Sequence, residues 1–241
     1  MGGKTLKETT VEPIPTNCGV IDRILKGGIP RGYATLVYGP FKTGKTTLAM
    51  QCAVACAREG MKTLFIDADN SFSTTRLSQI AGYDINSVAP LIILFKPKSF
   101  REQNTIIENL ENLTSKKVAL IAVDTVTSLY RVELGGIEKT FALNRILNRQ
   151  LAYLVKIAKE SHTALLLTSQ VHSVLGKEGV GRIEPVAERV LKFWSQNILR
   201  LECSEKTHLR EAFLEKHLGF RSTDIHILFA LTEDGVTDVE R

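Results

Sequence analysis

Two carboxylates, Asp67 and Asp69, follow a short apolar run in the segment Ile66–Phe72, which reads IDADNSF. On an extended strand, positions i and i+2 lie on the same side, so both carboxylates can face one site. An acid at such a strand end can orient an attacking water molecule, or it can order nearby backbone N–H groups. Either Asp67 or Asp69 could be the water-orienting residue, and the choice depends on the neighbouring strands.

The glycine-rich pattern G-x-x-x-x-G-K-[ST] starts at Gly39, between a predicted strand and a predicted helix. Its glycines let backbone N–H groups turn toward phosphate oxygens, and the helix N-terminus adds a positive dipole. Lys45 is expected to reach the β- and γ-phosphates of a nucleotide, and Thr46 to ligate Mg²⁺. The pattern therefore predicts a nucleoside triphosphate site. Its predicted binding residues are Gly39, Pro40, Phe41, Lys42, Thr43, Gly44, Lys45, Thr46 and Thr47.

A second acid for the metal ion stands at Asp124, directly after the six apolar residues Val118–Val123. A buried strand that ends in a carboxylate is the Walker B pattern, in which the acid holds Mg²⁺ through water. Helix N-capping is the simpler alternative for Asp124. If this strand lies beside the P-loop strand, the strand ending at Ile66 can flank it. The residues after Ile66 would then overhang the γ-phosphate.

Apolar runs with β propensity alternate with helical periodicity, which predicts an α/β fold with a mostly parallel sheet flanked by helices. Helices are predicted at Thr46–Arg58, Phe100–Leu113 and Thr140–Glu160. The segment Glu233-Asp234-Gly235 predicts a hairpin turn, and hence an antiparallel C-terminal extension. The predicted strands are Tyr33–Tyr38, Lys62–Ile66, Leu91–Leu94, Val118–Val123, Ala164–Thr168, Asn197–Glu202 and Ile225–Thr232.

The chain of 241 residues is 44% hydrophobic, enough for one large core. The polar residues 1–15 are expected to be a flexible or edge segment, and residues 16–241 a single core domain. The longest apolar runs are far shorter than the roughly 20 residues that span a membrane. The N-terminus lacks the apolar segment of a secretory signal, so a cytoplasmic protein is expected. The four cysteines lack the spacing of a metal site or disulfide framework.

The order of these motifs resembles the core of the RecA/RadA recombinase family, including a later strand that reads LLLTSQ at residues 165–170. The resemblance implies a RecA-type P-loop ATPase core. In that family a catalytic glutamate follows the second core strand in a context similar to IDTEGTF, and Asp69 stands at its position. The γ-phosphate-sensing glutamine falls on Gln170, so the implied catalytic residues are Asp69, Lys45 and Gln170. Aspartate loses about 1.5 Å of reach, which predicts weak ATP hydrolysis.

Four further segments are similar to the archaeal RadB branch of that family: PTNCGVIDRILKGGIPRG before the P-loop, then SLYRVE, SQVH and LTEDGVTDVE. This resemblance implies an ATP- and Mg²⁺-dependent protein that binds single- and double-stranded DNA. It would assist a main recombinase of the RadA type in DNA recombination and repair, at the nucleoid, and it leaves self-association open. The chain departs from the family at Asn70, which replaces a glycine, and it lacks a Phe-x-x-Ala polymerisation peptide. A KaiC-like regulatory ATPase that acts through protein partners without DNA is the alternative.

The family's two DNA-binding loops map to residues 131–139 and 172–188. The first opens a basic stretch, with six basic and two acidic side chains over residues 131–159. A phosphate groove needs Lys and Arg, often with aromatic rings that stack on bases. The basic residues of the helix, from Arg145 to Lys159, can instead form its solvated face. The predicted DNA-binding residues are Tyr130, Arg131, Lys139, Lys177 and Arg182.

Overall fold

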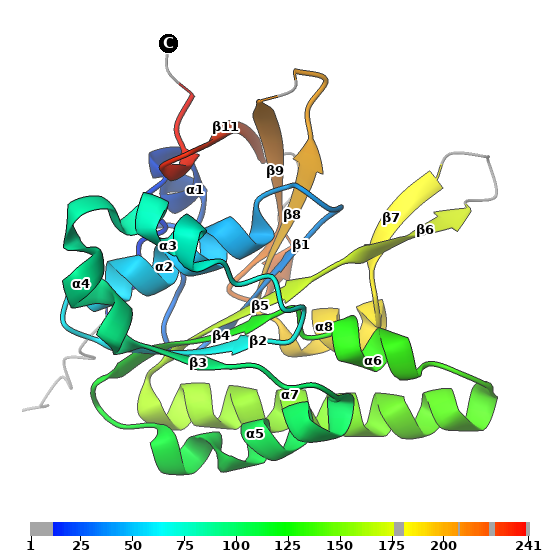
Figure 1. The fold of residues 1–241 in the computed structure, drawn as a ribbon. Helices are drawn as coiled ribbons and strands as arrows, with labels where there is room; N and C mark the ends of the chain where they lie inside the picture. Colours follow the sequence, from blue (N-terminus) through cyan, green and yellow to red (C-terminus); the bar gives the residue numbers. More distant parts are fainter. Residues whose placement is uncertain (1–11, 176–180, 207, 222–224, 240–241) are drawn as a thin grey trace, which may run out of the picture.

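One ten-stranded sheet crosses the molecule, and helices cover both of its faces (Figure 1). The structure is a computed structural model that describes residues 12–175, 181–206, 208–221 and 225–239, with residues 172–175 and 181–183 described by their backbone alone. The helices are α1 (Gly19–Ile24), α2 (Lys45–Arg58), α3 (Thr74–Ala81), η1 (Gly82–Asp84), α4 (Ile85–Val88), η2 (Ala89–Leu91), α5 (Phe100–Leu113), α6 (Ser128–Glu133), α7 (Ile137–Ser161) and α8 (Glu188–Trp194). The strands are β1 (Ala34–Tyr38), β2 (Lys62–Asp67), β3 (Ile92–Phe95), β4 (Val118–Asp124), β5 (Ala164–Ser169), β6 (Val171–Leu175), β7 (Gly181–Pro185), β8 (Asn197–Cys203), β9 (Leu209–His217), β10 (Phe220–Arg221), β11 (His226–Thr232) and β12 (Gly235–Thr237).

The strand order in the sheet is β12-β11-β9-β8-β1-β5-β4-β2-β3, with β10 paired to β9. Strands β8, β1, β5, β4, β2 and β3 run parallel, whereas β9, β11 and β12 continue the sheet antiparallel. The α/β fold with a mostly parallel sheet and an antiparallel C-terminal extension is therefore confirmed. Strand β4 flanks β2 but does not lie beside the P-loop strand β1, the arrangement considered from the sequence, because β5 lies between them. The side chains at the end of β5 consequently stand between the P-loop and the acids of β4 and β2.

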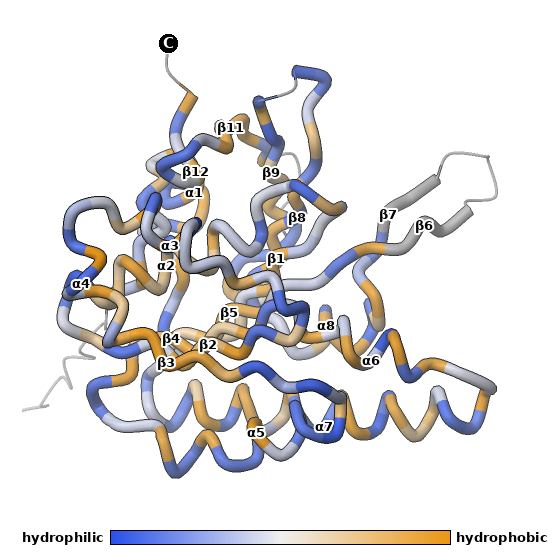
Figure 2. The backbone as a smooth tube through the Cα atoms, viewed as in Figure 1, coloured by the Kyte–Doolittle hydropathy of each residue, from blue (hydrophilic) through white to orange (hydrophobic). Residues whose placement is uncertain are grey.

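Alternating strand residues divide the core into two layers. On one face, residues such as Val37, Phe65 and Leu120 pack with α2 and α3. On the other face, their sequence neighbours Leu36 and Leu64 pack with α5, α7 and α8. Because both faces are covered, the central strands read as continuous apolar runs, which appear orange in Figure 2. The two layers hold the carboxyl ends of β1, β5, β4 and β2 at one edge.

Several elements differ from the sequence predictions. Helix α7 begins at Ile137, three residues earlier than predicted, and the predictions omitted α3 and the long strand β9. A flexible or edge segment is predicted over residues 1–15, yet Ile14 is fully buried and pairs with Ile29. The core therefore extends into that segment, while residues 1–11 lie outside the described part.

None of the helices among the described residues has the length and apolar character needed to cross a bilayer.

Candidate nucleotide and metal site

The P-loop joins the buried strand β1 to the N-terminus of α2. Gly39 has no room for a side chain, because a Cβ there would lie 2.2 Å from the carbonyl oxygen of Leu201. Gly44 caps α2 with φ of 95°, a conformation that favours glycine. The first turn of α2 carries no acidic residue, so its N-terminal dipole is free to attract an anion. The loop can therefore receive phosphate groups.

Lys45 folds back onto its own loop. Its Nζ donates hydrogen bonds to the carbonyl oxygens of Gly39 (2.9 Å) and Pro40 (2.7 Å). Burial lowers the pKa of the Lys45 ammonium, and the nearby carboxylates of Asp124 and Asp69 oppose that shift. A phosphate oxygen at the loop would compete for this ammonium with two neutral carbonyl groups, and a charged acceptor makes the stronger bond.

Asp124, at the end of β4, is fully buried beneath the P-loop helix. Its Oδ2 accepts hydrogen bonds from the hydroxyls of Thr46 (2.7 Å) and Ser71 (3.0 Å). Its Oδ1 accepts a short bond from Thr168 of β5. Burial raises the pKa of the Asp124 carboxyl, and the three hydroxyl bonds oppose the rise. The side chain does not serve as a helix N-cap, since these bonds all go to other elements.

This oxygen-rich set fits Mg²⁺ bound together with a nucleotide. Mg²⁺ takes oxygen ligands, usually one or two carboxylates with phosphates and water. Among the described residues, no group of three or more His, Cys, Asp and Glu side chains could hold a metal ion by itself. Thr46 and Asp124 therefore suit a metal ion that arrives with phosphate groups.

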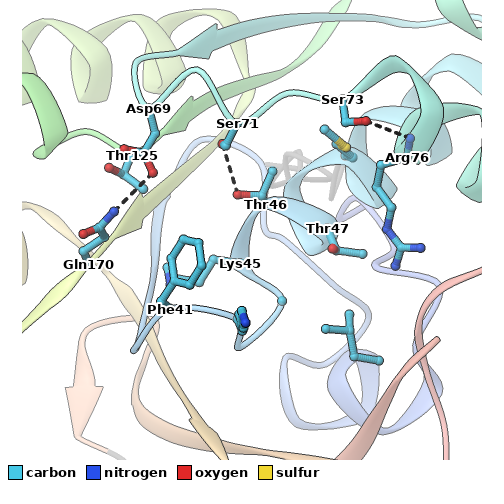
Figure 3. A pocket seen from close by; sticks show the side chains of 14 residues that line it. Phe41, Lys45, Thr46, Thr47, Asp69, Ser71, Ser73, Arg76, Thr125 and Gln170 are labelled. Atoms are coloured by element: carbon cyan, nitrogen blue, oxygen red, sulfur yellow. Dashed lines mark hydrogen bonds between the residues drawn. The ribbon is translucent and has the colours of Figure 1, made fainter. Parts of the chain in front are cut away.

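The two carboxylates of the IDADNSF segment have different surroundings. Asp67 is buried and accepts hydrogen bonds from the backbone N–H groups of Ser71 (2.9 Å) and Phe72 (3.1 Å). The ammonium of Lys96 lies 3.5 Å from its Oδ2. Asp69 instead lines the cavity at the P-loop, and its Oδ2 accepts a hydrogen bond from Nε2 of Gln170 (3.2 Å; Figure 3). The geometry thus gives Asp67 a turn-holding position and leaves Asp69 facing the cavity.

The cavity between the P-loop and β11 has a volume of about 280 Å³. It brings together the predicted residues Lys45, Thr46, Asp69 and Gln170. It also contains residues that the sequence predictions missed: Ser71, Ser73, Arg76, Thr125 and Leu231. A helix pattern after the IDADNSF segment would have been the signal for Ser73 and Arg76, whereas Ser71 lies within that segment.

Arg76 closes one side of the cavity (Figure 3). Its guanidinium donates to the carbonyl oxygens of Thr232 (2.6 Å), at the end of β11, and Glu233 (2.5 Å), in the turn that leads to β12. Burial lowers the pKa of Arg76, and the acids of that turn oppose the shift. The guanidinium thereby ties α3 to the C-terminal extension across the rim of the cavity.

The predicted DNA-binding residues are only partly accessible. Arg131 and Lys139 are exposed, on α6 and the start of α7. Tyr130 is 3% exposed, with its hydroxyl on Asn144 (3.0 Å) and its ring edge-on to Phe100. The prediction that Tyr130 stacks on a base is therefore wrong, because its ring is part of the core. Lys177 lies outside the described residues, and so does the side chain of Arg182, whose backbone is in β7.

The same surface carries exposed apolar side chains that the sequence predictions missed. Ile137 and Phe141 are 79% and 66% exposed and stand one turn apart at the start of α7. Farther along the helix, Arg149 pairs with Glu108 (3.0 Å) and Lys156 with Glu111 (3.6 Å) of α5. These two helix residues belong to a solvated, ion-paired face, as the simpler alternative predicted.

A P-loop after a buried strand, a Walker B acid on the strand two places away and a glutamine at the end of the strand between them define a P-loop ATPase core of the RecA type. A family model described as Rad51 matches residues 7–239. The chain belongs to this family.

Its relatives share most of its length. It is 36% identical over 230 residues to the DNA repair and recombination protein RadB of Thermococcus kodakarensis, covering 94% of this chain and 100% of the relative. It is 35% identical over 206 residues to the protein of the same name from Methanosphaera stadtmanae, covering 85% and 87%. A solved structure titled "Crystal structure of the RadB recombinase" matches with a TM-score of 0.80 at 35% identity, covering 94% of this chain and 100% of that chain.

Proposed function

We propose that this chain is an ATP- and DNA-binding recombinase paralogue, which assists DNA repair and homologous recombination and hydrolyses ATP weakly. The arrangement of Lys45, Thr46 and Asp124 around the P-loop carries the proposal. The RadB relatives, which are named for DNA repair and recombination, support the biological role. We further propose that the protein works with a main recombinase of the RadA type, near the nucleoid in the cytoplasm, and that it can self-associate.

Each residue at the site has a defined role in this proposal. The backbone N–H groups of the P-loop and the ammonium of Lys45 bind the phosphates. Thr46 and Asp124 hold Mg²⁺, which neutralises charge on the phosphates when it is bound. Asp69 orients the attacking water, and Gln170 connects that carboxylate to the strand that leads into β6, which pairs antiparallel with β7 to form the β6–β7 hairpin.

Weak hydrolysis follows from the length of the Asp69 side chain. Gln170 already holds its carboxylate at the cavity wall. An aspartate reaches about 1.5 Å less far than a glutamate, and a misplacement of about 1 Å can cost on the order of 10²-fold in rate. The protein would then respond mainly to the binding of ATP and much less to its hydrolysis.

The proposed DNA surface combines the guanidinium of Arg131 and the ammonium of Lys139 with the exposed ring of Phe141. Basic groups bind phosphates whatever the sequence, and an exposed ring can stack on a base. Binding is therefore expected to depend on salt and to tolerate changes of DNA sequence.

Two titrations test the proposal. Isothermal titration calorimetry with a non-hydrolysable ATP analogue and Mg²⁺ measures the nucleotide affinity of the wild type. Fluorescence anisotropy with a labelled single-stranded oligonucleotide, with and without the analogue, measures the DNA affinity. Nucleotide binding together with salt-dependent DNA binding is expected. Nucleotide binding without any DNA binding would contradict the recombinase role and favour an ATPase that acts through protein partners.

A further inference from the structure

The hydroxyl of Ser71 shares an acceptor with the P-loop threonine. Ser71 Oγ donates to Oδ2 of Asp124 at 3.0 Å, the same oxygen that accepts the hydroxyl of Thr46 at 2.7 Å. The two hydroxyl oxygens lie 3.4 Å apart, and Figure 3 shows the two side chains pointing toward one another. Both residues line the cavity at the P-loop. One carboxylate oxygen therefore orients two hydroxyl groups at the same place.

Contacts to buried residues fix the position of Ser71. Its backbone N–H is held by Asp67, a fully enclosed carboxylate at the end of β2. The next residue, Phe72, donates to the other oxygen of Asp67 and packs its ring edge-on against Phe65, with centroids 5.0 Å apart. Lys96 adds contacts to Asp67 (3.5 Å) and to Asn70 Oδ1 (3.2 Å). The turn is thus fastened to the core on both sides of the hydroxyl.

The direction of the hydrogen bonds decides what the hydroxyl can do. A hydroxyl that donates its hydrogen to Asp124 keeps its lone pairs for another partner. In the proposed function, Thr46 uses a lone pair to ligate Mg²⁺. Adjacent oxygens around an octahedral Mg²⁺ are about 3.0 Å apart, because the metal–oxygen distance is about 2.1 Å. The neighbouring Ser71 oxygen lies slightly beyond that spacing, which suits an acceptor for a water molecule of the metal shell.

We propose that Ser71 is a further residue of the metal site, whose hydroxyl accepts a hydrogen bond from a water bound to the Mg²⁺. The inference rests on the proposed function, since the metal ion arrives with ATP. It also explains the burial of Asp67, because this carboxylate positions the turn that presents Ser71. Asp67 is a positioning residue in this account, and Asp69 remains the carboxylate at the cavity.

The test separates metal binding from nucleotide binding. The Mg²⁺ concentration for half-maximal binding of a fluorescent, non-hydrolysable ATP analogue is measured for the wild type, Ser71→Ala and Ser71→Thr. Substitution of a residue that holds a metal's ligands typically lowers metal affinity by about 10- to 100-fold. We therefore expect Ser71→Ala to raise the Mg²⁺ midpoint at least about 10-fold, and Ser71→Thr, which keeps the hydroxyl, to stay near the wild type. Affinity for the analogue in excess EDTA should be the same for all three proteins.

Two further variants keep the result interpretable. Ser87→Ala likewise removes one serine hydroxyl, but this hydroxyl lies on α4, away from the cavity, and donates to the backbone carbonyl of Asp84, so the Mg²⁺ midpoint should not move. If Ser71→Ala does not fold, Ser71→Cys keeps the side chain's size and offers a soft sulfur, a poor partner for water on Mg²⁺. Mn²⁺ bound together with the analogue gives an electron paramagnetic resonance spectrum. Its line shape should differ from that of the wild type in Ser71→Ala and Ser71→Cys, but not in Ser71→Thr or Ser87→Ala.

An unchanged midpoint in Ser71→Ala, or in Ser71→Cys where only that variant folds, would overturn the assignment of Ser71. An equal loss of analogue affinity with Mg²⁺ and in EDTA would do the same, because it would indicate a structural role. Failure of the wild type to bind the analogue at any Mg²⁺ concentration is distinguishable from both. That result would overturn the proposed function and, with it, this inference.

Discussion

Gln170 Nε2 donates a hydrogen bond to Asp69 Oδ2 at 3.2 Å, which joins the end of β5 to the segment after β2 across the strand end of β4. The bond links the proposed water-orienting carboxylate to the strand that continues into the β6–β7 hairpin. A change in the position of Asp69 on nucleotide binding would therefore reach that hairpin through a single side chain.

Replacing Gln170 should make the affinity for DNA independent of whether ATP is bound. In Gln170→Ala, Asp69 loses its partner and β5 loses its contact with the cavity wall, whereas the P-loop contacts stay intact. We expect ATP affinity within about twofold of the wild type, and the ratio of DNA Kd values without and with ATP should fall toward one. Fluorescence anisotropy measures both DNA Kd values. A ratio equal to that of the wild type would rule out Gln170 as the connection.

Lys45→Ala should abolish detectable binding of ATP. The ammonium is the one P-loop side chain expected on the β- and γ-phosphates, and bonds between ions of opposite charge are roughly twice as strong as neutral ones. Calorimetry with Mg·ATP measures the loss, and a thermal melt at the wild-type Tm serves as the folding control. Unchanged calorimetric binding would refute the assignment of the nucleotide site.

Asp124→Asn should stabilise the protein without nucleotide and remove Mg²⁺-dependent binding. Burial raises the pKa of this carboxyl, so between its unfolded and folded pKa values the native state holds more protons. The group's contribution to stability is therefore lost as pH rises through that window, and a neutral side chain avoids the loss. We expect a higher Tm at neutral pH, by about 2–4 °C for each kcal/mol gained, and a smaller gain as pH falls. A lower Tm at neutral pH would contradict this account of Asp124.

Arg131→Ala should weaken DNA binding equally for all DNA sequences. The slope of the logarithm of the binding constant against the logarithm of the salt concentration should fall in magnitude by about one, since one phosphate contact is lost. Anisotropy titrations between about 50 and 200 mM salt measure the slope. Arg149→Ala is the matched control, because Arg149 lies on α7 but is paired with Glu108. Equal effects of the two substitutions would show that general charge, and not the proposed surface, governs binding.

Local spacing made the P-loop and Walker B residues predictable, since the pattern of glycines, Lys45 and Thr46 determines the loop around the phosphates. The position of β5 between β1 and β4 was not predictable in this way, because strand order depends on tertiary packing. The predicted role of Tyr130 failed for a similar reason. A tyrosine beside an arginine suits a DNA loop, and only the tertiary structure shows that its ring is buried and packs against Phe100. Arg76 was missed because α3 is a short helix of eight residues.

The turnover of ATP by Asp69→Glu tests the central claim most directly. Saturating Mg·ATP with single-stranded DNA gives kcat for the wild type, Asp69→Glu and Asp67→Asn. The longer side chain restores reach toward the attacking water, so kcat should rise about 10- to 100-fold while ATP affinity stays the same. The opposite pattern, an unchanged kcat in Asp69→Glu with hydrolysis lost in Asp67→Asn, would mean that Asp67 orients the water and that the proposed roles of the two carboxylates are reversed.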